Sequence, residues 1–320
     1  MGPTQQTLRA MLEQSMGQYR AHAPWLCQIE GFEHGLKSWL KIQSTRIYSE
    51  SFGDALRRAY PVRGNAPLAY RHRVVDCEDG LSILGGIRFR GGTFPFVDIL
   101  ATTADIEDAA AVWSRLKEHW ASFEPVGFRM LRSRPLDTRT LHVCPDQHLV
   151  AGPLARLGAT ATHHRPDVHL KSATPESALP IIERAYASLP AKLTGRVFPA
   201  SRLELGRCAH EGMLATIEHD GSAVGVIAAD RHHTLGLPGY RIVEMVILPE
   251  YRGQGYAQRA QTALACAFVH EHEHTMLYGW IDADNPASLG AAKRCGRTIL
   301  STLWWCIEPD KLSPGIRRLM

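Results

Sequence analysis

A short glycine loop carries the most specific chemical signal in the sequence. Residues 250–257 read EYRGQGYA, so Arg252 stands directly before Gly253 and three residues before Gly255. Because glycine has no side chain, a phosphate group can approach the backbone amides of such a loop closely. Arg252 adds a fixed positive charge. The loop therefore predicts a pyrophosphate-binding site.

The segments on either side of the loop are typical of a strand and a helix. Residues 241–248 read RIVEMVIL, a β-branched and apolar run that indicates a buried strand. After the loop, apolar residues recur at helical spacing from Ala260 to Phe268. The first turn of that helix would offer unpaired N–H groups and a positive dipole end to an anion. A Walker loop is excluded because no Lys-Ser/Thr pair follows the glycines, and the G-x-G-x-x-G dinucleotide fingerprint is absent.

Two motifs at linked spacing resemble the GNAT superfamily of acyl-CoA-dependent N-acyltransferases. The family's central motif, Gln/Arg-x-x-Gly-x-Gly/Ala, is matched by Arg252, Gly255 and Ala257. A second family pattern begins with an Asn before a helix that closes on a glycine, and Asn285 and Gly296 lie at the expected distance. Residues 170–310 are thus identified as a GNAT-like domain. The resemblance implies an α/β fold of the α+β kind, with a mixed sheet.

The resemblance also implies where acyl-CoA would bind. In this family two central parallel strands part, and CoA lies between them. The pantetheine would pair with the edge of the first of these strands and with Asn285 and Ser288 on the far side, while the pyrophosphate would lie on the loop. The donor-binding residues are then Val246, Ile247, Leu248, Arg252, Gly253, Gln254, Gly255, Tyr256, Ala257, Asn285 and Ser288.

Amine attack on a thioester needs a neutral amine, so a general base is useful. The resemblance assigns this role to Glu244, which alternation places on one face of its strand with Val246 and Leu248. The alternative is a structural Glu244 paired with an arginine such as Arg241. His232 and His233, before the same strand, are rival bases.

The usual acid of the family is missing from this sequence. A Tyr seven residues after the motif Asn normally protonates the leaving thiolate, and Ala292 stands at that position. Ser288, Tyr256 or a water would replace it, or the thiolate would leave unaided. The oxyanion donor would be a backbone N–H near Val246 or Ile247.

The N-terminal half has a similar order of predicted elements. Strands are predicted at residues 81–90, 94–100 and 126–131, and helices at residues 104–123, with Asp105 as N-cap, and at residues 147–157. The segment after Leu100 reads ATTA, without Gly or Arg. We therefore expect two GNAT-like domains: residues 1–165, degenerate and without a CoA loop, and residues 166–320, catalytic.

Composition narrows the class of protein. The 320 residues carry a net charge of +4 that is spread over both halves, which does not favour nucleic-acid binding. The seven cysteines form no C-x-x-C pair, which favours reduced thiols. The His-rich residues 270–274 suit the solvent-facing end of a helix better than a metal site. Without a long apolar run or a leader, we expect a cytoplasmic protein that binds neither a membrane nor a metal.

The sequence as a whole predicts an N-acetyltransferase. Acetyl-CoA, or another acyl-CoA, would donate its acyl group to a primary amine of a small molecule by direct attack, without a metal. The alternatives are an acyltransferase that uses a longer acyl-CoA or a protein or peptide amine, and a non-catalytic acyl-CoA-binding or scaffold protein.

Overall fold

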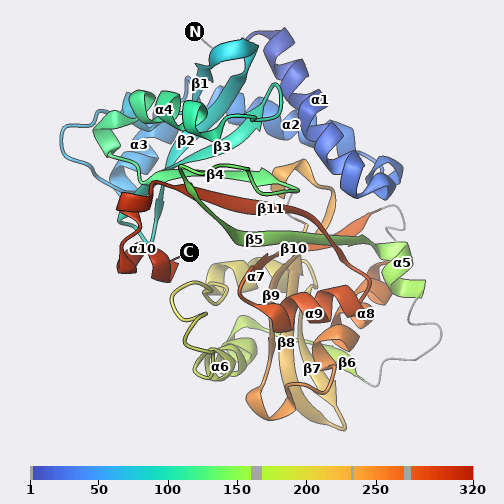
Figure 1. Cartoon of the computed structure of the whole chain (residues 1–320). Coiled ribbons are helices and arrows are strands. Elements are labelled where there is room, and N and C mark those ends of the chain that lie inside the picture. The colour runs from blue at the N-terminus through green and yellow to red at the C-terminus, as the bar shows by residue number, and fades with distance from the viewer. Residues whose placement is uncertain (1–2, 160–167, 232–233, 270–274, 320) are drawn as a thin grey trace. The chain divides into compact units, whose positions relative to one another are not determined.

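The computed structural model describes residues 3–159, 168–231, 234–269 and 275–319 (Figure 1). The chain forms two compact units, each assembled from separate segments. Unit 1 consists of Met1–Pro24, Glu33–Gln147 and Ser301–Met320, and unit 2 consists of Trp25–Phe32 and His148–Leu300. The boundary expected between residues 165 and 166 lies outside the described residues and stays a prediction.

Unit 1 is a mixed sheet with helices. Its strand order is β1-β2-β3-β4-β11-β5, in which β3 and β4 run parallel and the pairs β1-β2, β2-β3 and β4-β11 are antiparallel. Its helices include α1 (Gln5–His22), α2 (Phe32–Thr45), α3 (Glu50–Ala59), α4 (Ala109–His119) and α10 (Pro314–Leu319). The strands are β1 (Arg73–Asp76), β2 (Ser82–Arg90), β3 (Phe94–Thr102), β4 (Gly127–Arg132), β5 (His142–Pro153) and β11 (Thr298–Ile307). Helix α4 packs Trp113 and Leu116 against Val97 and Phe128, and this cluster forms the core of the unit.

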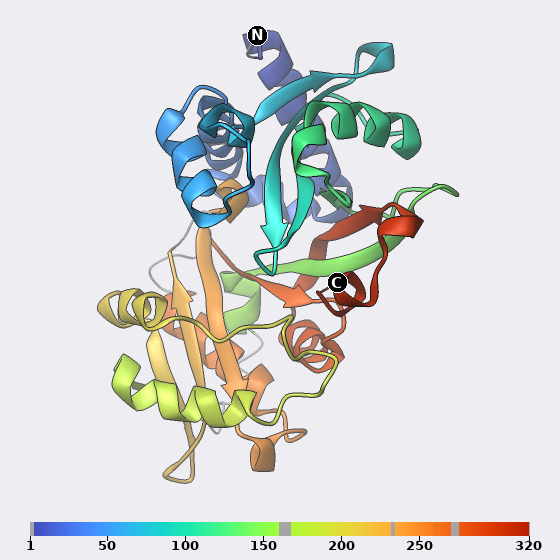
Figure 2. The same ribbon diagram turned by 90° about the vertical axis from the view of Figure 1, so that its left-hand side faces the viewer.

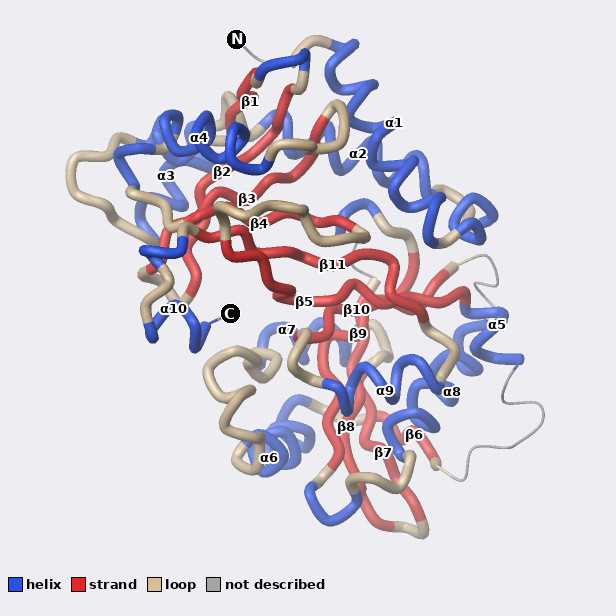
Figure 3. The backbone as a smooth tube through the Cα atoms, viewed as in Figure 1, coloured by secondary structure: helices blue, strands red, loops and turns tan. Residues whose placement is uncertain are grey.

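In unit 2 the strand order is β5-β10-β9-β8-β7-β6, with both parallel and antiparallel pairs (Figure 3). Its strands include β6 (His169–Ser172), β7 (Leu214–His219), β8 (Ser222–Asp230), β9 (Gly239–Ile247) and β10 (Met276–Asp282). Its helices are α5 (Leu154–Ala159), α6 (Pro175–Tyr186), α7 (Arg202–His210), α8 (Tyr256–Val269) and α9 (Pro286–Arg294). Helices lie on both faces of these strands (Figure 2). The alternation in β9 separates two cores, because Val246 packs under α6 and α7 whereas Met245 and Ile247 pack under α8.

Local sequence explains where the helices of unit 2 begin. Thr174 and Ser201 each cap a helix through a capping box, so the first backbone N–H groups of α6 and α7 are satisfied. Asn285 caps α9, and Pro286 follows at the first helical position. These caps fix the elements that surround the loop between β9 and α8.

Two predictions for the N-terminal half are wrong. Residues 147–157 were expected to be helical, but β5 continues to Pro153 and only α5 is helix. The run around Leu149 and Val150 is fully buried, and periodicity alone does not distinguish a buried strand from a buried helix. The cap of α4 is Asp108 instead of Asp105: its Oδ1 accepts from the backbone N–H groups of Ala110 (2.8 Å) and Ala111 (3.0 Å).

None of the helices in the described part of the chain combines the length and the apolar character that a membrane crossing requires.

Candidate active site

Strands β9 and β10 are paired only at their beginnings. They run parallel over three residue pairs, Gly239–Arg241 against Met276–Tyr278, and the pairing then ends. On its other side β9 stays paired with β8 up to Ile247, through a bulge in which Val243 is the extra residue. A bulge bends a strand and increases its twist. Residues 242–247 of β9 therefore form an edge without a strand partner on the β10 side, here called the open edge.

Along the open edge, the backbone N–H and C=O groups of successive residues point alternately toward β8 and toward the gap on the β10 side. The Leu248 N–H donates to the Val224 carbonyl of β8 at 2.9 Å. The Val246 carbonyl also faces β8, since a Cβ at Gly225 would lie only 2.2 Å from it. By alternation, Met245 and Ile247 direct their backbone groups into the gap. Of the three residues expected to pair with pantetheine, Ile247 is therefore the one whose N–H faces the gap.

The glycine loop follows the open edge directly and leads into α8. Gly253 and Gly255 have φ angles of +79° and +82°, a conformation that favours glycine. No described residue accepts a hydrogen bond from the backbone N–H groups of residues 253–257. These donors, at the positive end of α8, form the cradle that the sequence predicts for a pyrophosphate.

Arg252 is tied to the protein's own backbone. Its guanidinium donates to the carbonyls of Ile247 (3.1 Å), Ser188 (3.2 Å) and Ala185 (2.9 Å). The last two carbonyls lie at the end of α6, where a cation is favourable for the helix dipole. Arg252 thus connects α6 to the open edge, a positioning contact that its place in the motif does not reveal.

A second cation, Arg259, lies beside the loop. It is four residues after Gly255 on α8, donates to the Gln254 carbonyl at 2.6 Å, and lies 4.4 Å from the centre of the Tyr256 ring. Tyr256 itself is 5% exposed and packs against Tyr251 and His219. The Tyr256 ring is therefore part of the core. Arg259 adds a positive charge beside the loop amides, and the sequence analysis did not identify this residue.

Glu244 is a buried carboxylate that accepts hydrogen bonds from three donors. It is 5% exposed and accepts from the Ala200 N–H (2.9 Å), from the Met245 N–H (3.0 Å), and from the Tyr186 hydroxyl at 3.3–3.4 Å. Burial raises the pKa of Glu244 above its ordinary value, and the hydrogen bonds oppose this shift. A carboxylate with a raised pKa is a better proton acceptor.

The alternatives to a catalytic Glu244 are an ion pair with Arg241 and the rival bases His232 and His233. Arg241, the partner expected if Glu244 were structural, instead forms a two-point ion pair with Asp230 (3.1 and 2.7 Å). His232 and His233 lie outside the described residues, as do His270, His272 and His274. The described residues hold no group of three or more His, Cys, Asp or Glu side chains suited to a metal ion.

At the beginning of α9 the predicted residues lie together. The Asn285 Oδ1 accepts from the Ser288 N–H at 3.1 Å, so the carbonyl oxygen of this amide serves as the helix cap. Ser288 is half-buried one turn into the helix. Ala292 is fully buried, in a cluster with Val150 and Ile281. A tyrosine would not fit at this position without displacing core residues.

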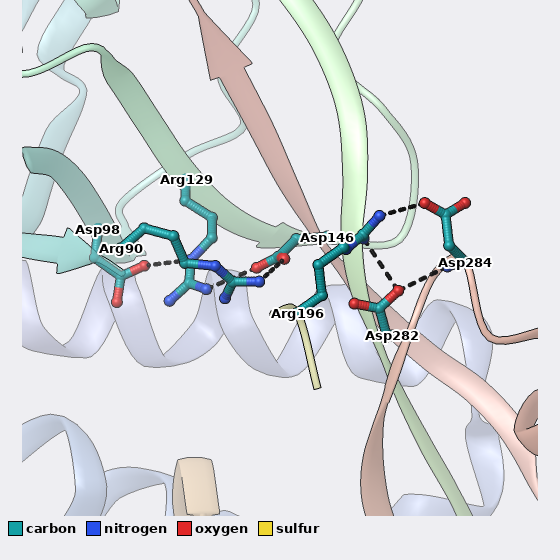
Figure 4. Close-up of polar contacts among 7 residues, drawn as sticks. All are labelled: Arg90, Asp98, Arg129, Asp146, Arg196, Asp282 and Asp284. Carbon is teal, nitrogen blue, oxygen red and sulfur yellow. Dashed lines mark hydrogen bonds and ion pairs between the residues drawn. The ribbon is translucent and has the colours of Figure 1, made fainter. Parts of the chain in front are cut away.

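The loop between α6 and α7 closes over the acid on β9. Ala200 and Phe198 of this loop contact Glu244 and Tyr186, through the Ala200 N–H and the Phe198 carbonyl. Arg196 of the same loop pairs with Asp282 at 3.0 Å and with Asp284, at the end of β10 (Figure 4). The Arg196 contacts hold the loop to the strand on the far side of the gap.

Comparison with known proteins agrees with this geometry. Residues 183–296 match the acetyltransferase (GNAT) family model. The chain contains a GNAT domain. The matched segment includes the open edge, the glycine loop, Glu244 and Asn285. No curated protein matches the chain in sequence.

One solved structure shares the fold of the chain with a TM-score above 0.5, and two further structures are similar to it with lower scores, all at low sequence identity. A GNAT-family acetyltransferase from Colwellia psychrerythraea is 12% identical and has a TM-score of 0.51, and the match covers 83% of this chain and 96% of the other. A GCN5-related N-acetyltransferase from Sphaerobacter thermophilus is 13% identical with a TM-score of 0.46, covering 80% and 86%. A tandem GNAT protein from the clavulanic acid biosynthesis pathway is 12% identical with a TM-score of 0.41, covering 82% and 94%.

Two residues of the GNAT domain's site were not found from sequence. Tyr186 ends α6 and Arg196 lies in an irregular loop, so neither belongs to a periodic pattern or a motif. Both act through contacts with residues distant along the chain, Glu244 and Asp282. A single sequence carries no signal for such pairs.

Proposed function

We propose that the protein is an acyl-CoA-dependent N-acyltransferase that transfers an acetyl group from acetyl-CoA to a primary amine of a small molecule. The observation that carries the proposal is the composition of one strand and its loop. The open edge of β9, the unpaired amides of residues 253–257 and the buried Glu244 lie within sixteen consecutive residues, 242–257. Residues that bind an extended donor and residues that move a proton are thus adjacent.

The described residues offer contacts to the acyl-CoA molecule at three separate points. The loop amides and Arg259 offer donors and positive charge to the pyrophosphate. The N–H of Ile247 faces the gap and can pair with a pantetheine amide, as one strand pairs with another. The side-chain nitrogen of Asn285 can donate to the pantetheine from the opposite side of the gap, because only the side-chain oxygen caps α9.

In the proposed reaction, the neutral amine attacks the thioester carbon. A C–N bond forms, the C–S bond breaks, and the proton of the amine passes to Glu244. Because Glu244 is 5% exposed and already accepts from Ala200 and Met245, the proton reaches it through a water. The thiolate is a good leaving group, and Ser288 or a water supplies its proton. Tyr256 is less suited to this role because its ring packs in the core.

We further propose that unit 1 is a degenerate GNAT-like domain without a CoA loop. Its strands β3 and β4 also run parallel over three pairs only, Val97–Ile99 against Phe128–Met130. After β3, however, the first amides of α4 are taken by the Asp108 carboxylate. A carboxylate at this position repels a phosphate and uses the donors that it would need.

Helix α1 supports the same interpretation of unit 1. Its Met11 packs with Ala101 and Leu84 beside the end of β3. Gln14 and Gln18 donate to Asp105, in the segment between β3 and α4 (2.9 and 3.3 Å). Within unit 1, protein side chains therefore cover the segment that corresponds to the glycine loop of unit 2.

The proposal is tested by incubating the full chain with acetyl-CoA and a panel of primary amines while free thiol is measured. Thiol release that depends on a small amine supports the proposal. Faster release with a longer acyl-CoA, or only with a peptide amine, would change the substrate class. Binding of acetyl-CoA without turnover of any amine would instead favour a non-catalytic acyl-CoA-binding or scaffold protein.

A further inference from the structure

One face of the sheet in unit 1 carries two carboxylates that are already neutralised. Arg129 of β4 donates to Asp98 (3.1 Å) and to Asp146 (2.8 Å), and Arg90 pairs with Asp146 at 3.1 Å (Figure 4). The Asp146 side chain is fully buried. Two guanidinium groups and two carboxylates therefore balance one another in this cluster.

Arg88 lies on the same face without such a partner. It is two residues from Arg90 on β2, so alternation places both side chains on one side of the sheet. Its guanidinium donates to the Ile87 carbonyl and meets the His72 Nε2, both at 2.8 Å. No carboxylate in the described part of the chain lies within ion-pair distance of it, and the carboxylate whose charge opposes the effect of burial on its pKa, Asp98, is already paired with Arg129. Burial lowers the pKa of Arg88, so its charge is held away from water.

His72 adds a polar contact to Arg88 but no negative charge. It is 1% exposed, and its Nδ1 lies 3.1 Å from the Gln43 carbonyl. Because a guanidinium only donates, the His72 Nε2 accepts from it and the proton is on Nδ1. Burial and the charge of Arg88 lower the pKa of His72 to about 3, so the ring is neutral near pH 7. Gly86 makes room for it, since a Cβ there would lie 2.4 Å from the ring.

A second arginine shares an aromatic ring with Arg88. The guanidinium carbon of Arg46 lies 4.8 Å from the centre of the Phe52 ring, and that of Arg88 lies 5.7 Å from it. Arg46 donates to the Gln43 side chain at 2.9 Å and, among the described residues, forms no ion pair. Burial lowers its pKa too. Two like charges are thus partly shielded from water beside the same ring, which is unfavourable unless an anion joins them.

We propose that Arg88 and Arg46 bind the anionic group, a carboxylate or a phosphate, of a small ligand on unit 1. The planar fork of a guanidinium matches either group with two parallel hydrogen bonds. Phe52 orients both arginines through its ring face, and His72 holds Arg88 from the other side. This binding site is independent of the proposed acyl transfer.

The test is titration of the full chain with inorganic phosphate and, in a second arm, with succinate, followed by calorimetry and thermal unfolding. Saturable binding is expected in at least one arm, and the arm that binds tells phosphate from carboxylate ligands. Arg88→Met and Arg46→Gln are each expected to weaken binding tenfold or more. Arg58→Gln, which removes an exposed charge on α3, is the matched control and should bind as the wild type does.

The unliganded protein gives a second readout. If the charge of Arg88 awaits an anion, Arg88→Met should raise the unfolding midpoint without ligand and abolish its increase with ligand. A lower midpoint together with unchanged binding would show that Arg88 is structural. The proposal is overturned if neither probe binds saturably, or if Arg88→Met and Arg46→Gln both bind as the wild type does. Arg46 is half-buried at the edge of the cluster, so its variant keeps the test valid if Arg88→Met does not fold.

Discussion

Glu244 combines burial with hydrogen bonds from two backbone amides, so its carboxylate is fixed in place and has a raised pKa. Glu244→Gln removes the proton acceptor while keeping the size of the side chain. We expect turnover to fall about 100-fold or more, the usual contribution of a general base. The dissociation constant for acetyl-CoA should be unchanged, because Glu244 contacts none of the loop amides. Steady-state kinetics and calorimetric titration measure the two quantities.

The glutamine amide would face the backbone donors of Ala200 or Met245 with its own N–H groups. Displacement of the loop that carries Ala200 would then add to the loss of turnover. Unchanged turnover at an unchanged unfolding midpoint would show that Glu244 is not the base.

Tyr186 offers a milder change at the same site. Its hydroxyl shares one proton between the Phe198 carbonyl (3.0 Å) and the Glu244 carboxylate (3.3 Å), and the hydrogen bond to Glu244 lowers the pKa of a carboxyl group whose pKa burial raises. Tyr186→Phe removes the donor, so the pKa of Glu244 should rise further. Since the base acts when deprotonated, turnover at low pH should be lost at a higher pH than in the wild type. A pH–rate profile measures this shift, and an acid limb that does not move would argue against titration of Glu244 in the reaction.

For single residues, the sequence predicts the place of a side chain on its strand or loop better than it predicts the residues that the side chain contacts. Alternation places Glu244 and Val246 on one face of β9, which the structure confirms. The three carbonyl contacts of Arg252 could not be predicted, because they depend on where α6 ends in space. Glycine spacing indicates a phosphate cradle, whereas tertiary packing decides which cation faces it.

The glycine loop makes a prediction at the scale of one element. Gly255 has a φ of +82°, and a branched side chain there would be strained and would cover the amides of the cradle. Gly255→Val should raise the dissociation constant for acetyl-CoA tenfold or more, about 1.4 kcal/mol. Isothermal titration measures it.

Gly221 provides the matched control for this substitution. It has a φ of +74° in the turn between β7 and β8, away from the loop. Gly221→Val introduces a similar strain, and its affinity for acetyl-CoA should equal that of the wild type. Equal affinities for all three proteins would exclude the loop as the pyrophosphate site.

Elements with a motif or a clear period were predicted correctly, and the others were not. Strand β9, the loop and α8 follow the predicted order because glycine, proline and apolar periodicity all agree there. Residues 147–153 form a strand because they are buried on both faces, which removes the alternation that marks an exposed strand. For α4, several acidic residues could serve as cap, and Asp108 is the one whose carboxylate reaches the amides.

At the scale of the whole molecule, neither unit is confined to its own half of the chain. Residues 302–307 of β11 pair with β4 in unit 1, and residues 148–153 of β5 belong to unit 2. Fragments 1–165 and 166–320 would each lack a segment that its own unit needs. We expect neither fragment alone to unfold cooperatively, and co-expression to restore a cooperative transition. Circular dichroism during heating measures this, and two independent cooperative transitions would contradict it.

Composition could not reveal this arrangement. The length predicts two units, and the apolar content predicts an ordinary core. The order of elements along the chain is the same whether the last strand pairs within its own half of the chain or with a strand of the other half. The choice depends on long-range pairing, here the antiparallel register of Thr302–Ile307 with Gly127–Arg132. Such pairing leaves no mark on local periodicity.

The central claim is that one strand and its loop in unit 2 bind acetyl-CoA and deliver its acetyl group to an amine. The most direct test is mass spectrometry of amines incubated with acetyl-CoA and either wild type or Glu244→Gln. We predict that at least one small primary amine becomes N-acetylated by the wild type, and far more slowly by the variant although it still binds acetyl-CoA. Wild type that binds acetyl-CoA and acetylates no amine, or a variant as fast as the wild type, would contradict this account.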